Sequence, residues 1–248
     1  MKKIILFGSS AIDYIATSDQ PLEYKVSNSG KLATAYGGVT RNVAHNLSKL
    51  GNKVTVVTAL GKGEMANSLK KHYASLKVRV VDVPTKYPTS TYVAINDSNH
   101  DMEIAIFDNR AIKDVTPSYI KKISNIINQH DYIFIDGNVT QETTEYICKH
   151  FSHKKIFCDP IAPEFVPRFL NVLDKIYLMK LNIYEARALV NNQKLENPSD
   201  LQEFDPFQDE DLKKRLWKRF RNFRCRELIF LFRGDRSCST SRAVSERS

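Results

Sequence analysis

The sequence predicts an α/β fold, consisting of a mostly parallel sheet with helices on both faces and a small β lid. Two observations lead to this prediction. From residue 39 onward, segments with helical periodicity alternate with short apolar segments, as in a parallel sheet covered by helices. A pair of alternating segments, residues 89–95 and 102–107, interrupts that order and is joined by a polar turn, as in a β-hairpin.

The first predicted strand is residues 3–7, an apolar run that we expect to be buried on both faces. A secretory signal needs roughly 7 to 15 apolar residues, and this run stops at Gly8. Residues 12–36 contain stretches in which apolar and polar residues alternate, which predicts a short segment of antiparallel strands. The other predicted helices are 39–50, 64–75, 117–129, 143–150 and 183–191, and the other predicted strands are 53–60, 79–83, 131–136, 155–158 and 175–181.

Ligands in sheets of this kind bind beyond the carboxyl ends of the strands. The predicted elements place a small set of residues at such ends. They are Asp13, Gly37, Gly38, Gly61, Asn138, Asp159 and Asn182.

The net charge of +9 is concentrated at the C-terminal end of the chain. Residues 212–248 contain three Lys and nine Arg and carry +9, whereas residues 1–211 are neutral overall. This tail is either a frameshifted or otherwise aberrant translation, or a basic arm that binds nucleic acid. The change from a Lys-rich body to an Arg-, Ser- and Cys-rich end favours the first interpretation, so a nucleic-acid partner is not expected.

The four cysteines form no Cys-x-x-Cys pair, which predicts free thiols in a reducing, cytoplasmic protein. Cys148, His150 and His153 are close in sequence, but a closed zinc site needs four well-spaced ligands, so we expect no metal there. No apolar run approaches the roughly 18 residues of a membrane-spanning helix.

Two glycines, Gly37 and Gly38, open a predicted helix whose first turn contains Asn42. Without a Cβ, the backbone can approach a ligand closely, and an amide side chain can both donate to and accept from a hydroxyl. A tight strand-to-helix turn explains the glycine pair equally well.

The order of several motifs along the chain is more specific than any one of them. The chain contains Gly-Ser-Ser-Ala-Ile-Asp at 8–13, Gly-Gly-x-x-x-Asn-x-Ala from 37, Asp-Gly-Asn at 136–138, Asp-Pro at 159–160 and Asn-x-x-Glu at 182–185. This succession over residues 3–191 resembles the ribokinase-like (PfkB) carbohydrate kinase family. Within the family, Gly-Gly-Val-x-Arg-Asn-x-Ala and Asp108-Asn109 are most similar to pseudouridine kinases. The resemblance implies a truncated ribokinase-like domain at residues 1–211, with its lid at about 14–36 and 89–107.

The resemblance also implies a substrate site. Asp13 would accept hydrogen bonds from sugar hydroxyls, since one carboxylate can accept from two vicinal hydroxyls. Asn42 and the backbone at Gly37 and Gly38 would hold the same ring. A loop or cap role is the alternative for Asp13.

Four further residues receive roles from the resemblance. Asn109 would contact the base or sugar, and Asn138 would line the site unless it is simply a turn residue. Asn182 and Glu185 match the family's Asn-x-x-Glu motif, which organises Mg²⁺ and the ATP phosphates through water. A helix cap, with Asn182 as N-cap and Glu185 at the third helical position, is an equally good and compatible interpretation.

Two family motifs are altered or missing. The family's Gly-x-Asp-x-x-Gly is replaced by Gly-Lys-Gly-Glu-Met-Ala at 61–66, which is also not a phosphate-binding P-loop. The family's Gly-Ala-Gly-Asp, whose Asp is the catalytic base, is not found. Asp235 follows Arg-Gly but lacks the glycine-rich approach and the following helix, so we assign no catalytic residue.

The expected function is ATP-dependent transfer of a phosphoryl group to the hydroxymethyl group of a sugar or nucleoside, either pseudouridine or a ribose-like compound. Because the base is not found, we expect weak or absent turnover. A non-catalytic nucleoside-binding or dimerising remnant of such a kinase is the alternative, and a homodimer through the lid is expected in either case. A dinucleotide-binding dehydrogenase is disfavoured, because no Gly-x-Gly-x-x-Gly follows the first strand.

Overall fold

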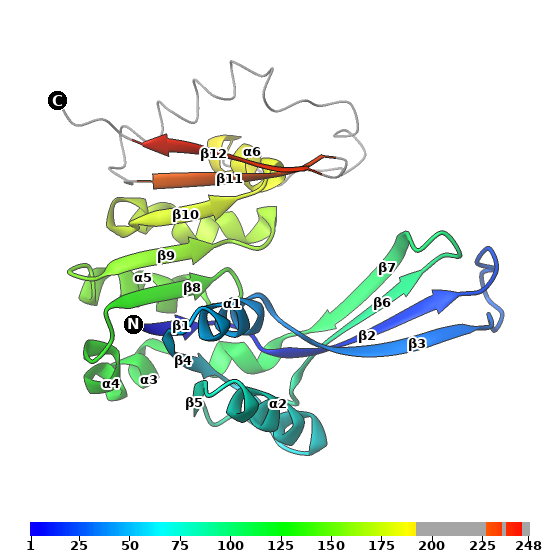
Figure 1. The fold of residues 1–248 in the computed structure, drawn as a ribbon, viewed down its shortest axis with the longest axis horizontal. Helices are drawn as coiled ribbons and strands as arrows, with labels where there is room; N and C mark the ends of the chain where they lie inside the picture. The colour runs from blue at the N-terminus through cyan, green and yellow to red at the C-terminus, as the bar shows by residue number, and fades with distance from the viewer. Residues whose placement is uncertain (192–226, 235–236, 245–248) are drawn as a thin grey trace. The chain divides into compact units, whose positions relative to one another are not determined.

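The computed structural model describes residues 1–191, 227–234 and 237–244 (Figure 1). The chain divides into two compact units. Unit 1 comprises Met1 and Leu6–Val115, and unit 2 comprises Lys2–Ile5 and the described residues from Thr116 onward. Strand β1 (Lys3–Phe7) therefore contributes residues to both.

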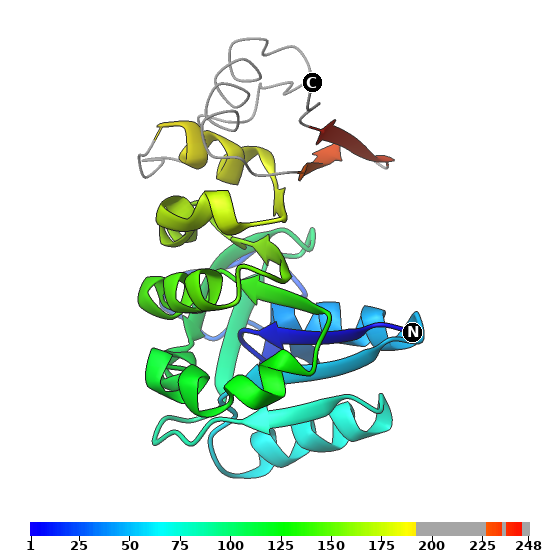
Figure 2. The same ribbon diagram turned by 90° about the vertical axis from the view of Figure 1, so that its left-hand side faces the viewer.

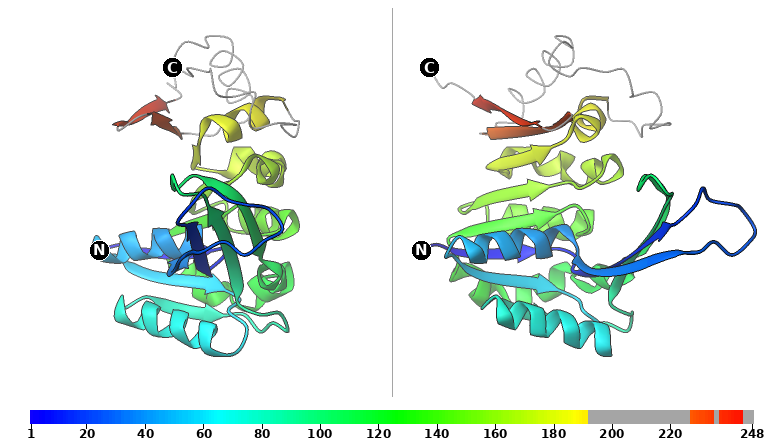
Figure 3. Two further views of the ribbon diagram at one scale, coloured as in Figure 1. Left: turned by 90° about the vertical axis from the view of Figure 1, so that its right-hand side faces the viewer. Right: turned by 45° about the vertical axis from the view of Figure 1, so that its right-hand side comes forward.

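Unit 1 contains a four-stranded sheet in the order β3-β2-β6-β7, whose long strands are seen side by side in Figure 3. Its strands are β2 (Ala11–Ser18), β3 (Gly30–Gly37), β6 (Ser90–Asn96) and β7 (Met102–Asp108). β2 pairs antiparallel with β3 and parallel with β6, and β6 pairs antiparallel with β7. The predicted hairpin (residues 89–107) and the predicted antiparallel segment (residues 12–36) are therefore two halves of one sheet.

Successive side chains along each strand point to opposite faces of this sheet, and directly paired residues share a face. Asp13 lies opposite Ala35 and Tyr92 in the register, so these residues share one face. Tyr14 lies opposite Thr34 and Val93 on the other face. We call these the Asp13 face and the Tyr14 face.

The rest of unit 1 is a strand-and-helix layer. Its elements are α1 (Val39–Lys49), β4 (Lys53–Thr58), α2 (Glu64–Ser75), β5 (Arg79–Asp82) and the short 3-10 helix η1 (Arg110–Asp114). β4 and β5 are parallel. Ile12 of β2 packs with Leu60, Ala66 and Leu69 in a buried cluster, which ties the small sheet to α2.

Unit 2 has four parallel strands followed by one antiparallel strand. The strands are β8 (Tyr132–Asp136), β9 (Lys155–Asp159), β10 (Leu178–Leu181), β11 (Glu227–Gly234) and β12 (Ser237–Val244). The helices are α3 (Pro117–Lys122), α4 (Ser124–Asn128), α5 (Gln141–His150), the 3-10 helix η2 (Pro163–Lys175) and α6 (Ile183–Asn191). Figure 2 shows α5, η2 and α6 on the same side of the strands.

Three segments differ from the sequence prediction. The helix predicted at 117–129 is broken at Ile123, which has non-helical dihedral angles and separates α3 from α4. The strand predicted from 175 begins at Leu178, because the preceding residues form η2, which has proline at two of its positions. β11 and β12 were not predicted.

The predicted fold class is confirmed: parallel strands with helices, together with a small second sheet. Within the described residues, no helix is both long enough and apolar enough to cross a membrane. Asp235 lies outside the described residues, as do most residues of the basic tail.

Candidate functional site

Asp13, the third residue of β2, lies directly against the backbone of Gly37 at the end of β3. A Cβ added to Gly37 would overlap both oxygens of the Asp13 carboxylate. The absence of a Cβ at Gly37 therefore leaves room for the Asp13 side chain at the point where β3 passes into α1. A ligand contact by the Gly37 backbone stays a prediction.

Gly38 is the N-cap residue of α1 and has φ of 90°, a backbone conformation that L side chains rarely adopt. A Cβ at this position would also collide with the carbonyl oxygen of Ser9. Asn42 lies one turn further along α1, where its N–H donates to the Gly38 carbonyl at 3.0 Å. The Asn42 side chain is exposed to solvent. The structure thus brings Asp13, Gly37, Gly38 and Asn42 together at one end of α1.

The Asp13 carboxylate is half-buried, and within the described chain it has no hydrogen-bond or ion-pair partner. Burial raises the pKa of Asp13, and the nearby charge of Arg41 opposes that rise. A desolvated carboxylate without donors is unfavourable. Hydroxyl groups of a ligand would remove that penalty.

Asn109 has a structural role beside this group. Its side-chain oxygen accepts hydrogen bonds from the hydroxyls of Ser9 and Ser90, each at 2.8 Å. These bonds connect the residue after β7 to the start of β6 and to the loop after β1. A ligand contact by Asn109 stays a prediction.

In unit 2, the turn after β8 is tied to the loop after β9. The Gly137 N–H donates to the Asp159 carbonyl at 2.8 Å, and a Cβ on Gly137 would collide with the Pro160 carbonyl. The Asn138 N–H donates to Asp136 Oδ1 at 2.9 Å. Asn138 is therefore a turn residue, the alternative that the sequence left open, and its contact with a ligand stays a prediction.

Asp159, at the end of β9, forms an ion pair with Lys180 of β10, with Nζ 3.2 Å from Oδ2. Its Oδ1 also accepts from the Ile161 N–H at 2.9 Å. Ile161 has φ of 72°, which is unusual for a β-branched residue. The Asp159 side chain thus holds the loop after β9 in a conformation that the local sequence disfavours.

Asn182 and Glu185 form a reciprocal cap at the start of α6. The Glu185 N–H donates to Asn182 Oδ1 at 2.9 Å, while the Asn182 N–H and Nδ2 donate to Glu185 Oε2 and Oε1 at 2.7 and 2.8 Å. This is the helix cap that the spacing predicted.

Glu185 is fully buried, and this burial raises its pKa to about 7. The negative charges of Asp159 and Glu164 act in the same direction, while the Asn182 hydrogen bond and Lys180 oppose them. These observations do not fit Glu185 as a direct Mg²⁺ ligand, because both oxygens already accept hydrogen bonds from Asn182. Within the described residues, no group of three or more His, Cys, Asp or Glu side chains could hold a metal ion.

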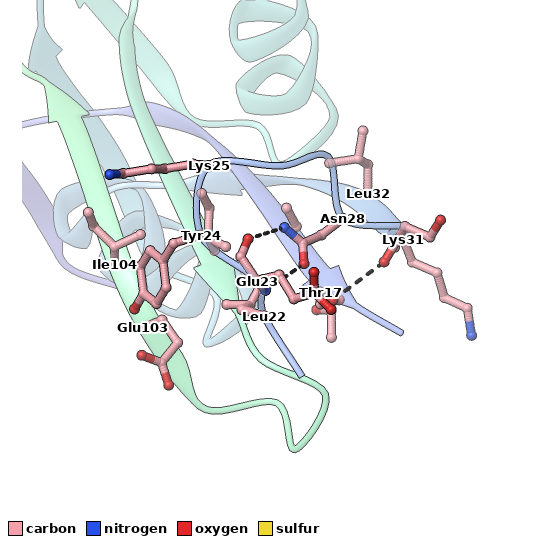
Figure 4. Close-up of a pocket in the computed structure, with 15 residues that line it drawn as sticks. Thr17, Leu22, Glu23, Tyr24, Lys25, Asn28, Lys31, Leu32, Glu103 and Ile104 are labelled. Atoms are coloured by element: carbon pink, nitrogen blue, oxygen red, sulfur yellow. Dashed lines mark hydrogen bonds between the residues drawn. The ribbon is translucent and has the colours of Figure 1, made fainter. Parts of the chain in front are cut away.

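A cavity of about 610 Å³ lies at the far end of the small sheet, away from the predicted substrate residues (Figure 4). The loop between β2 and β3 borders it, and Asn28 holds that loop by accepting from the Glu23 N–H and donating to the Glu23 carbonyl. Tyr24 of the loop and Ile104 of β7 are among its lining residues.

The sequence missed two arginines near the predicted sites. Arg41 is on α1, where burial lowers its pKa and the charges of Tyr73, Asp13 and Tyr36 oppose that shift. Arg168 of η2 donates to the carbonyls of Gly137 and Val139 in the turn after β8. The Gly-Gly-x-x-x-Asn spacing gives no sign that the residue before the asparagine is buried.

Solved structures of sugar kinases share this fold. A carbohydrate kinase from Agrobacterium tumefaciens has a TM-score of 0.77 at 22% identity, over 94% of this chain and 71% of that one. Ribokinase from Thermotoga maritima has a TM-score of 0.76 at 16% identity, over 100% of this chain and 79% of that one. The fold is therefore that of the ribokinase-like kinases.

The chain belongs to the pfkB family of carbohydrate kinases, whose model matches residues 1–218. The pseudouridine kinase of Escherichia coli is 29% identical over 188 residues, which cover 75% of this chain and 60% of that protein. The ribokinase of Bacillus subtilis is 25% identical over 152 residues, covering 60% and 52%. The chain thus spans between half and two thirds of the length of these relatives.

A Gly37→Ala substitution should displace the Asp13 carboxylate and weaken the binding of ribose or pseudouridine about tenfold or more, since charge-assisted hydrogen bonds of about 1.5–3 kcal/mol would be lost. Titration calorimetry would measure the affinity. Gly51→Ala is the matched control, because Gly51 also has a positive φ but no atom lies near its missing Cβ. That variant should lose about 1 kcal/mol of stability and keep its affinity. Equal affinity in Gly37→Ala and the wild type would contradict this role.

Glu185 should make the protein less stable as the pH rises. Its pKa is raised in the folded state, so its contribution is fully present below about pH 4.5 and is lost as the pH rises through about 7. The contribution is at most about 3 kcal/mol. Melting temperatures between pH 5 and 8 should fall less steeply in Glu185→Gln than in the wild type, whereas Glu142→Gln, an exposed residue of α5, should leave the slope unchanged. Parallel slopes in all three proteins would contradict the assignment.

Proposed function

We propose that this protein binds a sugar or nucleoside and transfers the γ-phosphoryl group of ATP to its hydroxymethyl group. The observation that carries the proposal is the Asp13 carboxylate, which is half-buried, lies against the Gly37 backbone and has no partner in the described chain. A carboxylate in this state is suited to accept from two vicinal hydroxyls of a furanose ring. Asn42, exposed in the first turns of α1, would contact the same ring.

The names of the relatives support a pentose or nucleoside substrate. They include the pseudouridine kinases of Escherichia coli and Arabidopsis thaliana and a guanosine-inosine kinase of Exiguobacterium acetylicum. Pseudouridine is our first choice, since the most similar of these relatives carries that name. ATP as phosphoryl donor is supported by an Arabidopsis thaliana ribokinase whose solved structure contains ribose and ATP.

The part of the chain that we assign to the reaction binds and orients the acceptor. Asp13 and Asn42 would fix the ring, and the Gly38 backbone would approach it at the start of α1. Such positioning supplies much of the rate enhancement in phosphoryl transfer. A contact of Glu185 with Mg²⁺ through water stays a prediction, and no step is derived from it.

For these 248 residues taken alone we expect little turnover, because their sequence contains no Gly-Ala-Gly-Asp to supply a catalytic base. The same observation favours a second candidate function, a nucleoside-binding remnant of such a kinase without catalysis. Both candidates bind the ligand, and only the first releases ADP.

We place the end of the proposed catalytic domain near residue 211, while the family match extends to 218 and strand β11, within the basic tail, pairs with β10. A frameshifted or aberrant origin of residues 212–248 remains our hypothesis, and translation of all three frames of the gene beyond codon 190 tests it. We place the protein in the cytoplasm, in keeping with the buried thiols of Cys148 and Cys158, which form no disulfide.

We also propose that two copies associate through the Tyr14 face of the small sheet. Large apolar side chains on this face are exposed although they lie side by side in the register. They are Leu32, Val93, Ile95, Ile104 and Ile106. An apolar patch of this kind marks an interaction surface. A second copy presents the same patch and can pair with it around a two-fold axis.

Asp13→Asn should weaken the binding of pseudouridine or ribose about tenfold, since a neutral amide loses the charge-assisted hydrogen bonds. Calorimetry measures binding, and mass spectrometry of a mixture with ATP and Mg²⁺ detects phosphorylated product. The exposed Asp19→Asn is the control and should bind normally. Binding without product supports the remnant, product supports the kinase, and failure of the wild type to bind any sugar or nucleoside overturns both.

Ile106→Glu should convert a dimer into a monomer, because it buries a charge in the apolar contact. Light scattering after size-exclusion chromatography gives the mass. Leu50→Glu changes an equally exposed residue at the end of α1 and should leave the dimer intact. A wild-type protein that stays monomeric at high concentration would rule out this association.

A further inference from the structure

Four connections of the chain join the small sheet to the strand-and-helix layer of unit 1. They are residues 8–10 between β1 and β2, Gly38 between β3 and α1, residues 83–89 between β5 and β6, and Asn109 between β7 and η1. We call these four connections the base of the small sheet. Because the sheet carries Asp13 and the layer carries α1, the contacts at the base set how these two parts of the predicted acceptor site are placed.

Asn109 is the N-cap residue of η1, yet its side chain does not cap that helix. Asparagine is among the most favourable N-cap residues, because its side-chain oxygen can accept from an N–H of the first turn. Here that oxygen accepts instead from the hydroxyls of Ser9 and Ser90, at 2.8 Å each. Both serines are buried, so their hydroxyls need acceptors inside the protein. One amide oxygen therefore links the residue after β7 to the loop after β1 and to the first residue of β6.

The first of these hydrogen bonds leads to the start of α1. Gly38 lies so close to the loop after β1 that a Cβ on it would collide with the Ser9 carbonyl oxygen and would lie 3.0 Å from Ser10 Cα. The hydroxyls of Ser10 and Tyr73, both buried, are 2.7 Å apart and attach the same loop to α2. In such a close-packed arrangement, a shift of the loop also shifts Gly38 and the first turn of α1 with Asn42.

The second hydrogen bond leads to β2. Ser90 is paired with Ala11, and Ala11 is paired on its other side with Gly37. Asp13 is two residues further along β2 and therefore on the same face as Ala11. The two hydrogen bonds of Asn109 thus reach both sides of the predicted acceptor site, the start of α1 and the strand that carries Asp13.

We propose that Asn109 is a positioning residue, whose side-chain oxygen fixes the base of the small sheet and thereby the placement of Asp13 relative to the start of α1. This role assigns Asn109 no contact with the ligand, whereas the family resemblance implied one. The meaning of this for binding rests on the function proposed above. The packing of the base does not, and it can be measured without a ligand.

Hydrogen–deuterium exchange of the full chain, read by mass spectrometry, tests the packing of the base. In Asn109→Ala the two serine hydroxyls lose their acceptor, so peptides covering residues 8–13 and 38–42 should exchange about fivefold faster. Asn109→Asp keeps an acceptor oxygen in the same place and should exchange close to the wild type. Faster exchange confined to residues 110–114 in Asn109→Ala overturns the proposal, and so does equal exchange in the two variants.

Pseudouridine binding, measured by calorimetry, separates positioning from ligand contact. Asn109→Ala and Ser9→Ala should each weaken binding about tenfold. The double variant should bind about as well as Asn109→Ala alone, because both substitutions remove the same hydrogen bond. Asn109→Asp should keep the affinity of the wild type, since it lacks only the amide N–H groups. Lost affinity in Asn109→Asp together with exchange like that of the wild type would assign a ligand contact to Asn109 and overturn the proposal.

A general loss of stability must be separated from positioning. Thr116→Ala is the matched control, because it removes the N-cap of α3 in unit 2, where the Thr116 hydroxyl accepts from the Tyr119 N–H at 3.3 Å. This variant should lower the melting temperature as Asn109→Ala does and leave pseudouridine affinity unchanged. An equal fall of affinity in Thr116→Ala would assign the effect to stability and overturn the proposal. If the wild type binds no sugar or nucleoside while exchange changes as expected, the proposed function fails and the positioning of the base by Asn109 stands.

Discussion

The arrangement around Asp13 in unit 1 depends on the absence of a side chain at Gly37. Any Cβ there would overlap the Asp13 carboxylate. The antiparallel pairing of β2 with β3 sets Gly37 opposite Ala11 and Ala35 opposite Asp13, which brings the Asp13 side chain against the Gly37 backbone. The positive φ of Gly38 then turns the chain into α1, and Asn42 follows one turn later. Two successive glycines thus bring Asp13 and the first turn of α1 close together.

The Asp13 carboxylate differs from the two carboxylates described in unit 2. In unit 2, Asp159 is paired with Lys180, and Glu185 accepts two hydrogen bonds from Asn182. These carboxylates stabilise loops and a helix end. In unit 1, Asp13 is half-buried and lacks such partners within the described residues. A buried polar group that the protein leaves unsatisfied is a sign of function, since folding alone would favour satisfying it.

Much of the fold could be predicted from periodicity. The helix at 183–191 and the hairpin around residue 98 matched closely, because their patterns were strong and their caps or turns were local. The break at Ile123 and the start of β10 at Leu178 could not be predicted, since they depend on tertiary packing and on 3-10 turns that have no clear apolar period.

The candidate site was predicted in part. Asp13 and Asn42 could be found because a motif marks them, whereas the contact between Asp13 and Gly37 depends on the pairing of two strands and has no local signal. Arg41 was missed for the same reason: its neighbours come from β2, β3 and α2. The raised pKa of Glu185 follows from burial, which a nine-residue helix pattern does not reveal.

The alternation of side chains along β2 has an evolutionary consequence. Positions 13, 15 and 17 belong to the Asp13 face, and positions 12, 14 and 16 to the Tyr14 face. One strand therefore contains two interleaved sets of residues that can vary separately. A substitution at Ala16, which pairs with Leu32 and Ile95 of the apolar patch, can alter what the sheet associates with while Asp13 on the other face is unchanged. Insertion or deletion of a single residue would exchange the two sets beyond that point, so this strand should tolerate substitution far better than any change in its length.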